Sequence, residues 1–375
     1  RIPAMGDSDL QDLLGNLKMP GRKPSGARDS PSSKGGSDMT TRQYRENLQG
    51  CGVADFTEVA VLGVGSFGMV KLVKHKRTGL LAAMKFLSKS HVLKTAQLEH
   101  VVAERDILWA LDSHLIPALY GSFQDTKYLY LILEFVPGGE FYSHLANKKW
   151  LTEEECKFYT ACVYLGLEYM HSRHIIYRDL KPENLLMDSR GYLKITDMGF
   201  AKLLPPGERT FTVCGTPEYL CPEIIQSRGH TGAADWWCLG ILIYEMFAGF
   251  PPFESENRME LYEMIIHRRP KFPADFPPLV KDLVNQLLQV DLSKRLGNLS
   301  GGSKDIMNHP WFADFDWQAL RSGQMPAPFV PTLRGPEDVS AFDGAEELEA
   351  DHDESPLTRE EAAQFKIFDK IAAIV

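Results

Sequence analysis

The densest group of chemically useful side chains lies near the middle of the chain. Residues 177–184 (YRDLKPEN) supply a carboxylate at Asp179, an ammonium at Lys181 and a carboxamide at Asn184, and a second carboxylate follows at Asp197. Oxygen atoms of Asn184 and Asp197 are the hard ligands that Mg²⁺ prefers. Asp179 is placed to accept a proton from a hydroxyl group, and Lys181 to steady a phosphoryl group during transfer. A surface turn also favours Asp, Asn and Gly, but the full combination predicts metal-assisted phosphoryl transfer to an alcohol.

A glycine-rich segment, residues 63–68 (GVGSFG), lies upstream of this group. Dinucleotide-binding turns have the same spelling, but they lead from a strand into a helix. Residues 69–73 (MVKLV) instead read as a second strand, so we expect a hairpin. Its glycines would let backbone N–H groups approach phosphate oxygens closely. An ordinary glycine-rich hairpin is the alternative.

Lys85 lies within an apolar strand segment, where an unpaired charge is costly. Glu104 has apolar neighbours at helical spacing and is the natural partner for its ammonium group. Phosphates could also pair with this lysine. The alternative is a lysine that extends to solvent and a solvated glutamate.

The elements that must position these groups fall into two parts. Before the break at residues 137–139 (PGG) the chain is rich in strands, with one main helix carrying Glu104. Beyond it the chain is mostly helical, with a small hairpin at residues 185–196. The expected strands are residues 56–62, 69–75, 80–86 and 128–135, and the expected helices are residues 157–171, 235–248 and 279–288. The pattern predicts an α+β chain with two lobes.

Charge argues against a nucleic-acid binder. The 375 residues include 41 Lys and Arg against 50 Asp and Glu, a net charge of −9. Residues 337–354 hold nine acidic and no basic residues, so they account for the whole excess. The remainder is nearly neutral and lacks the basic surplus typical of proteins that bind nucleic acid.

Localisation follows from what the sequence does not contain. The longest strongly apolar run, residues 236–244, is shorter than a membrane span. No N-terminal stretch has the pattern of a secretory signal peptide. Six scattered cysteines indicate reduced thiols rather than a disulfide framework. We expect a cytoplasmic protein without a membrane span, and a nuclear location is also open.

The motifs described above resemble, in order and spacing, the signature set of eukaryotic protein kinases. Over roughly residues 50–342 the chain is similar to the AGC group, in particular to catalytic subunits of cyclic-AMP-dependent kinases. The supporting segments are residues 123–140, 176–201, 212–223, 235–253, 290–298 and 328–342. The resemblance implies a two-lobed protein kinase fold, with a small antiparallel sheet lobe and a larger helical lobe. It also implies serine/threonine kinase activity with ATP and Mg²⁺.

The same resemblance implies a domain division. The kinase domain would be residues 56–312, with the small lobe at 56–136 and the large lobe at 137–312. An N-terminal tail at residues 1–50, partly disordered, would precede it. An AGC-type C-terminal tail at residues 313–375 would follow it.

The resemblance assigns a role to each matched position of the nucleotide site. Lys85, held by Glu104, would grip the α- and β-phosphates. Asn184 and Asp197 would bind two Mg²⁺ ions, and Asp179 would orient the substrate hydroxyl. The loop over the phosphates would be Gly63, Gly65, Ser66, Phe67 and Gly68. The adenine slot would comprise Leu62, Val70, Ala83, Leu133, Leu186, Thr196 and the tail residue Phe342, with backbone groups of Glu134 and Val136 bonded to the adenine edge.

Thr212 matches the activating phosphorylation site of the family. A phosphate there would bind Arg178, Lys202 and, by analogy, His100, which would order the surrounding loop. The alternative is a plain surface threonine. Thr216 would hydrogen-bond to Asp179 and Lys181.

Substrate choice is implied by a set of acidic residues around the peptide groove. Carboxylates there attract arginine just before the acceptor Ser or Thr. The matched acids are Glu140, Glu183, Glu218 and Glu245, and the apolar pocket for the following residue would be Val213, Pro217 and Leu220. We expect preference for Arg-Arg-x-Ser/Thr-apolar peptides. A cyclic-nucleotide-binding regulatory subunit and a pseudosubstrate inhibitor are further possible partners.

Several positions depart from the family pattern. Met198 replaces the usual Phe, and Phe211 stands where the cyclic-AMP-dependent enzymes have Trp, which puts regulatory-subunit docking in doubt. Residues 365–368 (FKIF) resemble a hydrophobic motif that docks on the small lobe, and Asp369 after it could mimic a phosphate. Two alternatives stay open: a cyclic-GMP-dependent or other AGC kinase, and a pseudokinase scaffold. The intact catalytic and metal-binding positions argue against the scaffold.

Overall fold

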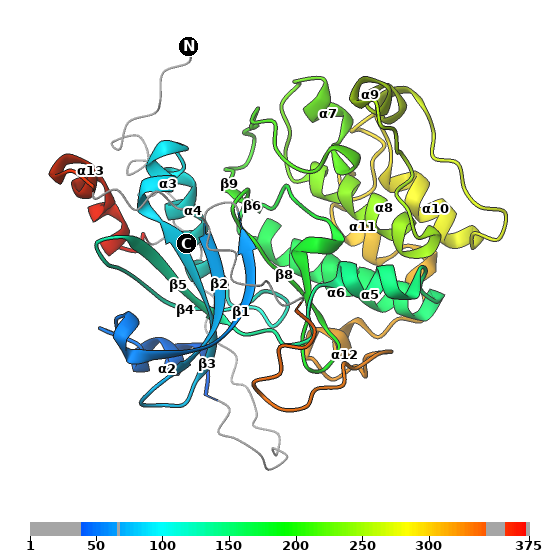
Figure 1. Cartoon of the computed structure of the whole chain (residues 1–375). Coiled ribbons are helices and arrows are strands. Elements are labelled where there is room, and N and C mark those ends of the chain that lie inside the picture. Colours follow the sequence, from blue (N-terminus) through cyan, green and yellow to red (C-terminus); the bar gives the residue numbers. More distant parts are fainter. Residues whose placement is uncertain (1–38, 66–67, 343–356, 373–375) are drawn as a thin grey trace.

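A five-stranded antiparallel sheet with the order β1-β2-β3-β5-β4 forms the small lobe (Figure 1). The computed structural model describes residues 39–65, 68–342 and 357–372. The strands are β1 (Phe56–Gly65), β2 (Gly68–His75), β3 (Leu81–Ser88), β4 (Leu119–Gln124) and β5 (Tyr128–Glu134). Gly65 pairs with Gly68 across the β1–β2 turn. The glycine-rich segment is therefore a hairpin, as its sequence predicts. The expectations for residues 1–38, Ser66 and Phe67 fall outside the described part of the chain.

Three helices belong to the small lobe: α2 (Thr41–Asn47), α3 (Lys89–Lys94) and α4 (Leu98–Ala110). Arg45 on α2 donates to the backbone oxygens of Leu119 and Trp109, so this helix is fixed to the sheet and to the end of α4. Helix α4 carries Glu104, and its buried side chains include Val101, Ile107 and Leu108. Burial of this apolar face positions the helix beside the sheet.

The large lobe is built around α8 (Ala233–Ala248), which packs against α6 (Glu153–His171) and α10 (Pro278–Leu287). Thr152 and Glu155 form a capping box, so α6 begins earlier than the hydrophobic pattern predicts. The other helices are α5 (Phe141–Lys148), α7 (Pro222–Ile225), α9 (Arg258–His267), α11 (Lys304–Met307) and α12 (Trp317–Arg321). Two short antiparallel pairs, β6 (Ile175–Ile176) with β9 (Lys202–Leu203) and β7 (Leu185–Met187) with β8 (Leu193–Ile195), lie at the lobe junction. The fold is the expected two-lobed α+β arrangement.

The C-terminal tail connects the two lobes (Figure 1, orange to red). Tyr192 Oη donates to Met325 O at 2.5 Å in the large lobe, and Glu337 pairs with Lys74 on β2 at 2.7 Å. Five residues after Glu337, the Phe342 ring lies 6.0 Å from the ring of Phe135.

Near the C-terminus, α13 (Arg359–Gln364) leads into the 3₁₀ turn Phe365–Asp369, which contacts β4 and α4 of the small lobe. Phe365 and Phe368 are fully buried there. The docking predicted for residues 365–368 is therefore present.

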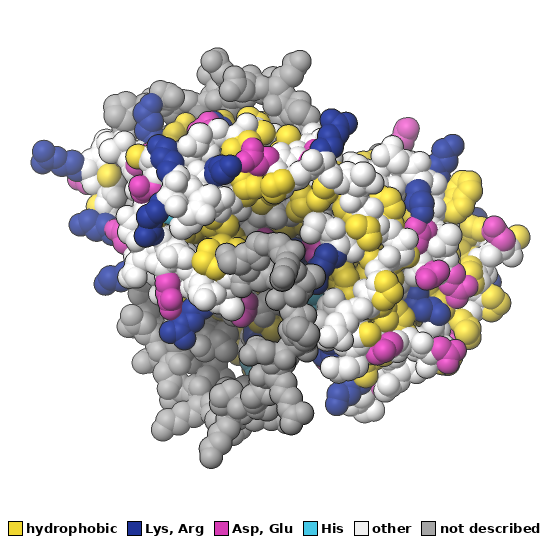
Figure 2. Space-filling view, turned by 90° about the horizontal axis from the view of Figure 1, so that it is seen from below, with side chains coloured by type: hydrophobic (Ala, Val, Ile, Leu, Met, Phe, Trp, Pro, Cys, Tyr) yellow, Lys and Arg dark blue, Asp and Glu magenta, His cyan; other side chains and the backbone are white. Residues whose placement is uncertain are grey.

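The surface is consistent with the charge analysis. On the face shown in Figure 2, basic side chains lie scattered among acidic and apolar ones. All six cysteines are free thiols. Within the described ranges, none of the helices combines the length and apolar character needed to cross a bilayer.

Candidate active site

Lys85 and Glu104 meet at the back of the small lobe. Strand β3 presents the lysine and α4 presents the glutamate, and Lys85 Nζ lies 2.8 Å from Glu104 Oε1. The Glu104 side chain is only 6% exposed. Burial acts to lower the pKa of Lys85, but the carboxylates of Glu104 and Asp197 outweigh it and leave that pKa raised. The lysine is therefore held as an ammonium that faces both carboxylates.

The loop that follows β6 gathers Asp179, Lys181 and Asn184. Asn184 Nδ2 donates to Asp179 Oδ2 at 2.7 Å and to its backbone oxygen at 2.9 Å. Lys181 Nζ lies 3.4 Å from Asp179 Oδ2 and donates to Thr216 Oγ1 at 3.1 Å. Burial raises the pKa of Asp179, with Lys181 and Asn184 acting in the opposite direction. A fixed carboxylate of increased basicity can accept a hydroxyl proton.

The candidate donors for Mg²⁺ are an amide oxygen and a carboxylate that flank two adjacent strands. Asn184 precedes β7 and Asp197 follows β8, and Thr196 N donates to Asn184 O at 2.9 Å. Because Nδ2 of Asn184 is committed to Asp179, Oδ1 is the carboxamide atom that could face a metal. Within the described residues no cluster of three or more His, Cys, Asp or Glu forms a closed metal site. Two protein ligands fit Mg²⁺, which usually keeps waters and takes phosphate oxygens.

The backbone is strained on both sides of this centre. Arg178 has φ 73° and Asp197 has φ 51°, both in the left-handed region that non-glycine residues rarely adopt. Asp235 holds the first of these positions through its two carboxylate oxygens. Oδ1 accepts from Arg178 N at 2.7 Å, and Oδ2 accepts from Tyr177 N at 2.9 Å.

Asp235 and its partner His171 were not among the predicted site residues. His171 Nε2 lies 2.6 Å from Asp235 Oδ2, and the Asp235 side chain is fully buried. The available signal was a carboxylate at the start of the largely apolar segment 235–248. A charge in such a helix requires buried partners.

The predicted adenine slot forms one apolar cluster. Leu62 and Ala83 are buried in it, and Val70, Leu133 and Phe342 pack against it. Ala83 is opposite Leu133 in the β3–β5 register. Strands β1, β2, β3 and β5 and the C-terminal tail thus contribute side chains to the same slot.

The lower side of the slot is placed by β7 and β8. Leu186 is bridged to Glu140 at the start of α5, and Thr196 Oγ1 donates to Asn184 O at 3.1 Å. The connection between the lobes contributes backbone groups. Glu134 N donates to Ala118 O at 2.8 Å, so its carbonyl oxygen is the group that could meet a ligand. Val136 is buried in the same connection.

Two cations lie beside the predicted phosphorylation site. Arg178 Nε donates to Phe200 O at 2.7 Å, while its buried Nη1 has no hydrogen-bond partner in the described structure. Lys202 Nζ donates to Thr210 Oγ1 at 3.3 Å. Burial lowers the pKa of Lys202, and the nearby charge of Arg178 lowers it further.

Thr212 itself is exposed, and α4, which carries His100, contacts β9, which carries Lys202. Because Lys202 Nζ donates to Thr210, this lysine contacts the threonine two residues before Thr212 rather than Thr212 itself.

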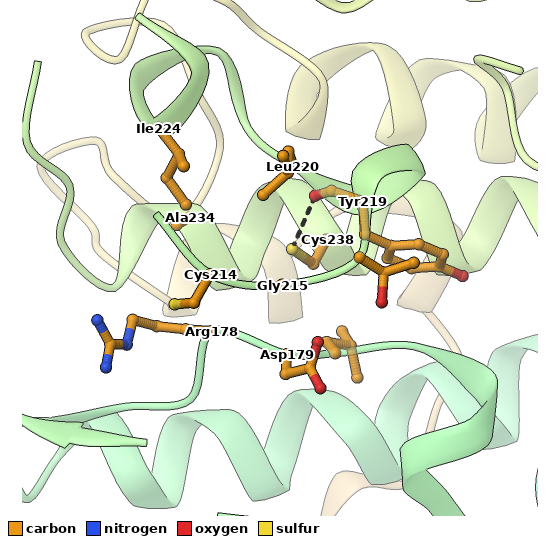
Figure 3. Close-up of a pocket in the computed structure, with 11 residues that line it drawn as sticks. Arg178, Asp179, Cys214, Gly215, Tyr219, Leu220, Ile224, Ala234 and Cys238 are labelled. Atoms are coloured by element: carbon orange, nitrogen blue, oxygen red, sulfur yellow. Dashed lines mark hydrogen bonds between the residues drawn. The ribbon is translucent and has the colours of Figure 1, made fainter. Parts of the chain in front are cut away.

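A small pocket separates the catalytic loop from the segment after Thr212 (Figure 3). Arg178 and Asp179 line it from one side, and their side chains point in different directions from the loop. Cys238 Sγ donates to Tyr219 O at 3.2 Å on the other side. The remaining lining residues are Leu180, Cys214, Gly215, Thr216, Leu220, Ile224 and Ala234. The Asp179 carboxylate is thus adjacent to the segment that carries the predicted apolar substrate pocket.

Three of the four predicted substrate acids influence one another. Glu245 accepts a hydrogen bond from Tyr219 Oη at 2.5 Å. Burial raises the pKa of Glu245, and the negative charges of Glu183, Glu218 and Glu254 raise it further. Glu254 was not in the predicted set, although it directly follows segment 235–253, which supports the family resemblance.

The fourth acid, Glu140, directly precedes α5 and forms a bridge with Leu186 of β7. Of the predicted apolar pocket, Leu220 is buried, Pro217 is half-buried and Val213 is exposed. An exposed valine beside a buried leucine fits a surface that receives an apolar side chain.

Met198, which departs from the family pattern, has a clear structural role, and a buried ion pair lies elsewhere in the large lobe. Met198 is fully buried in the large hydrophobic core, so its flexible side chain fills the position without opening a polar gap. Arg295 Nη1 and Nη2 lie 2.7 and 2.9 Å from the two oxygens of Glu223. This bidentate pair is buried two residues along the chain from the free thiol of Cys221.

Comparisons with known proteins show which family the chain resembles. The family model "Protein kinase domain" matches residues 56–312. A Dictyostelium discoideum "cAMP-dependent protein kinase catalytic subunit" is 46% identical over 295 residues, which cover 79% of this chain and 45% of the relative. The human "cAMP-dependent protein kinase catalytic subunit PRKX" is 42% identical over 314 residues, which cover 84% of this chain and 87% of the relative. The human "cGMP-dependent protein kinase 2" is 45% identical over 287 residues, which cover 76% of this chain and 38% of the relative. The chain thus spans less than half the length of the Dictyostelium relative.

Proposed function

The chain belongs to the protein kinase family, and on that basis we propose that it transfers the γ-phosphate of ATP to serine or threonine in arginine-rich peptides. The observation that carries the proposal is the convergence of Lys85, Asp179 and Asp197 from three separate segments. Asp197 acts electrostatically on both Lys85 and Asp179. The family matches to cyclic-AMP-dependent kinases favour a catalytic subunit of that type over the cyclic-GMP-dependent alternative, whose relative is covered to only 38%.

The proposed mechanism relies on positioning and charge stabilisation. Lys85, fixed by Glu104, binds the α- and β-phosphates beneath the hairpin that carries Gly63, Gly65 and Gly68. Bound Mg²⁺ supplies neutralisation of phosphate charge, with Asn184 and Asp197 as its protein ligands. Asp179 orients the substrate hydroxyl and accepts its proton, while Lys181 offsets charge on the transferring group.

Nucleotide and peptide binding follow from the two ends of the site. We propose that the apolar slot with Leu62, Ala83 and Leu186 holds adenine, and that backbone groups at Glu134 and Val136 bond to its edge. An apolar slot with a few backbone groups is suited to a flat heteroaromatic ring. The acids Glu140, Glu183, Glu218 and Glu245 bind arginine before the acceptor residue, and the pocket at Leu220 receives the apolar residue after it.

Phosphorylation of Thr212 is the proposed activating event. Arg178 and Lys202 are two nearby cations, and the buried Nη1 of Arg178 lacks a partner in the described structure. A phosphate on Thr212 would satisfy that group and link the catalytic loop to α4 through His100.

We also propose a cyclic-nucleotide-binding regulatory subunit and a pseudosubstrate inhibitor as partners, with the exposed ring of Phe211 on the facing surface. The free thiols support a cytoplasmic location.

Peptide phosphorylation tests the proposal directly. The wild-type chain, phosphorylated on Thr212, is assayed with a peptide containing Arg-Arg-x-Ser-apolar and with the same peptide carrying alanines for the arginines. We expect transfer to the first peptide, and little transfer by Asp179→Ala or Asp197→Ala. ATP binding without transfer by the phosphorylated wild type would instead support a pseudokinase scaffold. Equal rates on both peptides would contradict the arginine preference alone.

A further inference from the structure

A buried ion pair joins the two lobes next to their connection. Lys194 Nζ lies 2.8 Å from Glu134 Oε1 and 2.9 Å from Oε2. Glu134 ends β5 of the small-lobe sheet, whereas Lys194 is the middle residue of β8 in the large lobe. The lysine side chain is 5% exposed and the glutamate side chain 29%. The pair therefore bridges the small and large lobes. The distance between the lobes at this point sets the width of the apolar slot that we propose holds the adenine ring.

Glu134 is fixed on the small-lobe side. Its Oε2 also accepts from Ala118 N at 3.2 Å, and its own backbone N donates to Ala118 O at 2.8 Å. In the β3–β5 register it stands opposite Ala82, one position from the pair formed by Ala83 and Leu133. The carboxylate is thus attached to the upper wall of the apolar slot.

Lys194 is fixed on the large-lobe side. In the β7–β8 register it stands directly opposite Leu186, which we assign to the lower wall of the slot. The next residue, Ile195, donates its backbone N–H to Leu115 O at 2.8 Å. Strand β8 therefore cannot move away from the small lobe without breaking both contacts.

The electrostatic free energy of the Lys194–Glu134 pair favours a short distance between the two walls of the slot. A buried ammonium without a partner is strongly unfavourable, and Coulomb attraction in a low-dielectric region weakens as the charges separate. We propose that the Lys194–Glu134 pair is a positioning pair that sets the distance between the two walls of the adenine slot and thereby the affinity for ATP. The proposal rests on the nucleotide site described under Proposed function. Neither side chain is assigned to the chemistry, so the effect falls on binding.

The test compares Lys194→Met, which keeps the side chain's apolar length, with Lys194→Arg, which keeps the charge. Kd for ATP in the presence of Mg²⁺, KM for ATP, kcat and Tm are measured for each. We expect Lys194→Met to raise Kd and KM about fivefold with kcat changed less than about twofold. Lys194→Arg should restore most of the affinity. Lys148→Met is the matched control, because Lys148 pairs with Glu155 inside the large lobe. It should leave both nucleotide parameters unchanged.

Coupling between the partners provides a second, independent measurement. In the cycle of Lys194→Met, Glu134→Gln and the double variant, we expect the double variant to bind ATP no more weakly than the weaker single variant. Additive losses of affinity would overturn the proposal, as would a lower Tm for Lys194→Met with unchanged Kd. If Lys194→Met does not fold, Glu134→Gln and Lys194→Arg decide the question through the same ratio of KM to kcat. A wild type that does not bind ATP would contradict the proposed function instead.

Discussion

The carboxylate of Asp235 accepts a hydrogen bond from the backbone N–H of Arg178 at 2.7 Å, and Arg178 adopts φ 73°. A helix in the centre of the large lobe thereby holds the loop that presents Asp179. Such a backbone conformation persists only where its surroundings over-determine it. The geometry of the Asp179 carboxylate, our proposed base, consequently depends on a residue to which we assign no contact with the substrate.

Asp235→Asn should reduce kcat more than it raises KM for ATP. The amide group replaces one acceptor oxygen by a donor, so one of the two buried backbone N–H groups loses its partner. Loss of such a bond costs about 1–3 kcal/mol of folding free energy. Steady-state kinetics and urea unfolding measure the two effects. A variant with reduced stability and unchanged kcat would show that Asp235 supports the fold alone.

The pKa of Glu245 predicts the pH dependence of peptide binding. Burial and neighbouring carboxylates raise this pKa above the ordinary value of 4.5. As pH falls, Glu245 is therefore protonated before an ordinary glutamate, and KM for an arginine-containing peptide should rise in that window. Glu245→Gln should show a high KM with a flatter pH profile. An unchanged profile would contradict the role of this carboxylate.

Ionised Glu245 should favour binding of an arginine-containing peptide but lower the free energy of unfolding. Because the folded-state pKa is raised, the folded protein binds this proton more tightly than the unfolded chain, so ionisation at neutral pH disfavours folding. Glu245→Gln should therefore increase Tm at pH 7 while weakening peptide binding, and Tyr219 Oη can still donate to the amide oxygen. Thermal denaturation at pH 5 and pH 7 would show the gain shrinking at the lower pH. A lower Tm at pH 7 would contradict this reading.

Phosphorylation of Thr212 should increase both activity and order. A phosphate would bind the unpartnered Nη1 of Arg178 in a charge-assisted hydrogen bond, each worth about 1.5–3 kcal/mol. We expect Thr212→Ala to lower kcat about tenfold or more. Thr210→Val removes the hydroxyl that Lys202 contacts and tests whether this contact affects kcat in the unphosphorylated protein. The rate of backbone amide hydrogen exchange in β9 is measured for the phosphorylated and the unphosphorylated protein. Equal exchange and equal kcat in both forms would contradict activation at this site.

The C-terminal docking motif offers a matched set of substitutions. Phe365 and Phe368 are buried on the small lobe, with Arg105 donating to Phe368 O at 2.6 Å, whereas Ile367 between them is 51% exposed. Phe365→Ala or Phe368→Ala should each cost about 3–5 kcal/mol of docking or folding free energy and lower kcat, because Arg105 adjoins Glu104 on α4.

Ile367→Ala is the control and should change neither stability nor kcat. Tm and peptide phosphorylation measure both. Unchanged values for both phenylalanine variants would show that docking has no effect on α4.

The sequence determined the chemistry and the local elements. The spacing of Asp179, Asn184 and Asp197 specifies a loop, a short hairpin and a second loop, and side-chain type alone predicts candidate metal ligands and a candidate base. Alternating apolar residues with glycine punctuation specify the β1–β2 hairpin because backbone conformation there is decided locally.

Only the tertiary structure decided which distant groups share partners. The pairing of Arg178 with Asp235, the contact of Lys202 with Thr210 rather than Thr212, and the ion pair between Lys194 and Glu134 connect segments that carry no local signal for one another. Buried charges must find partners, but a sequence pattern states only that a partner is required. The packing of the two lobes selects which residue fills that role, because it brings β5 to β8 and the catalytic loop to α8.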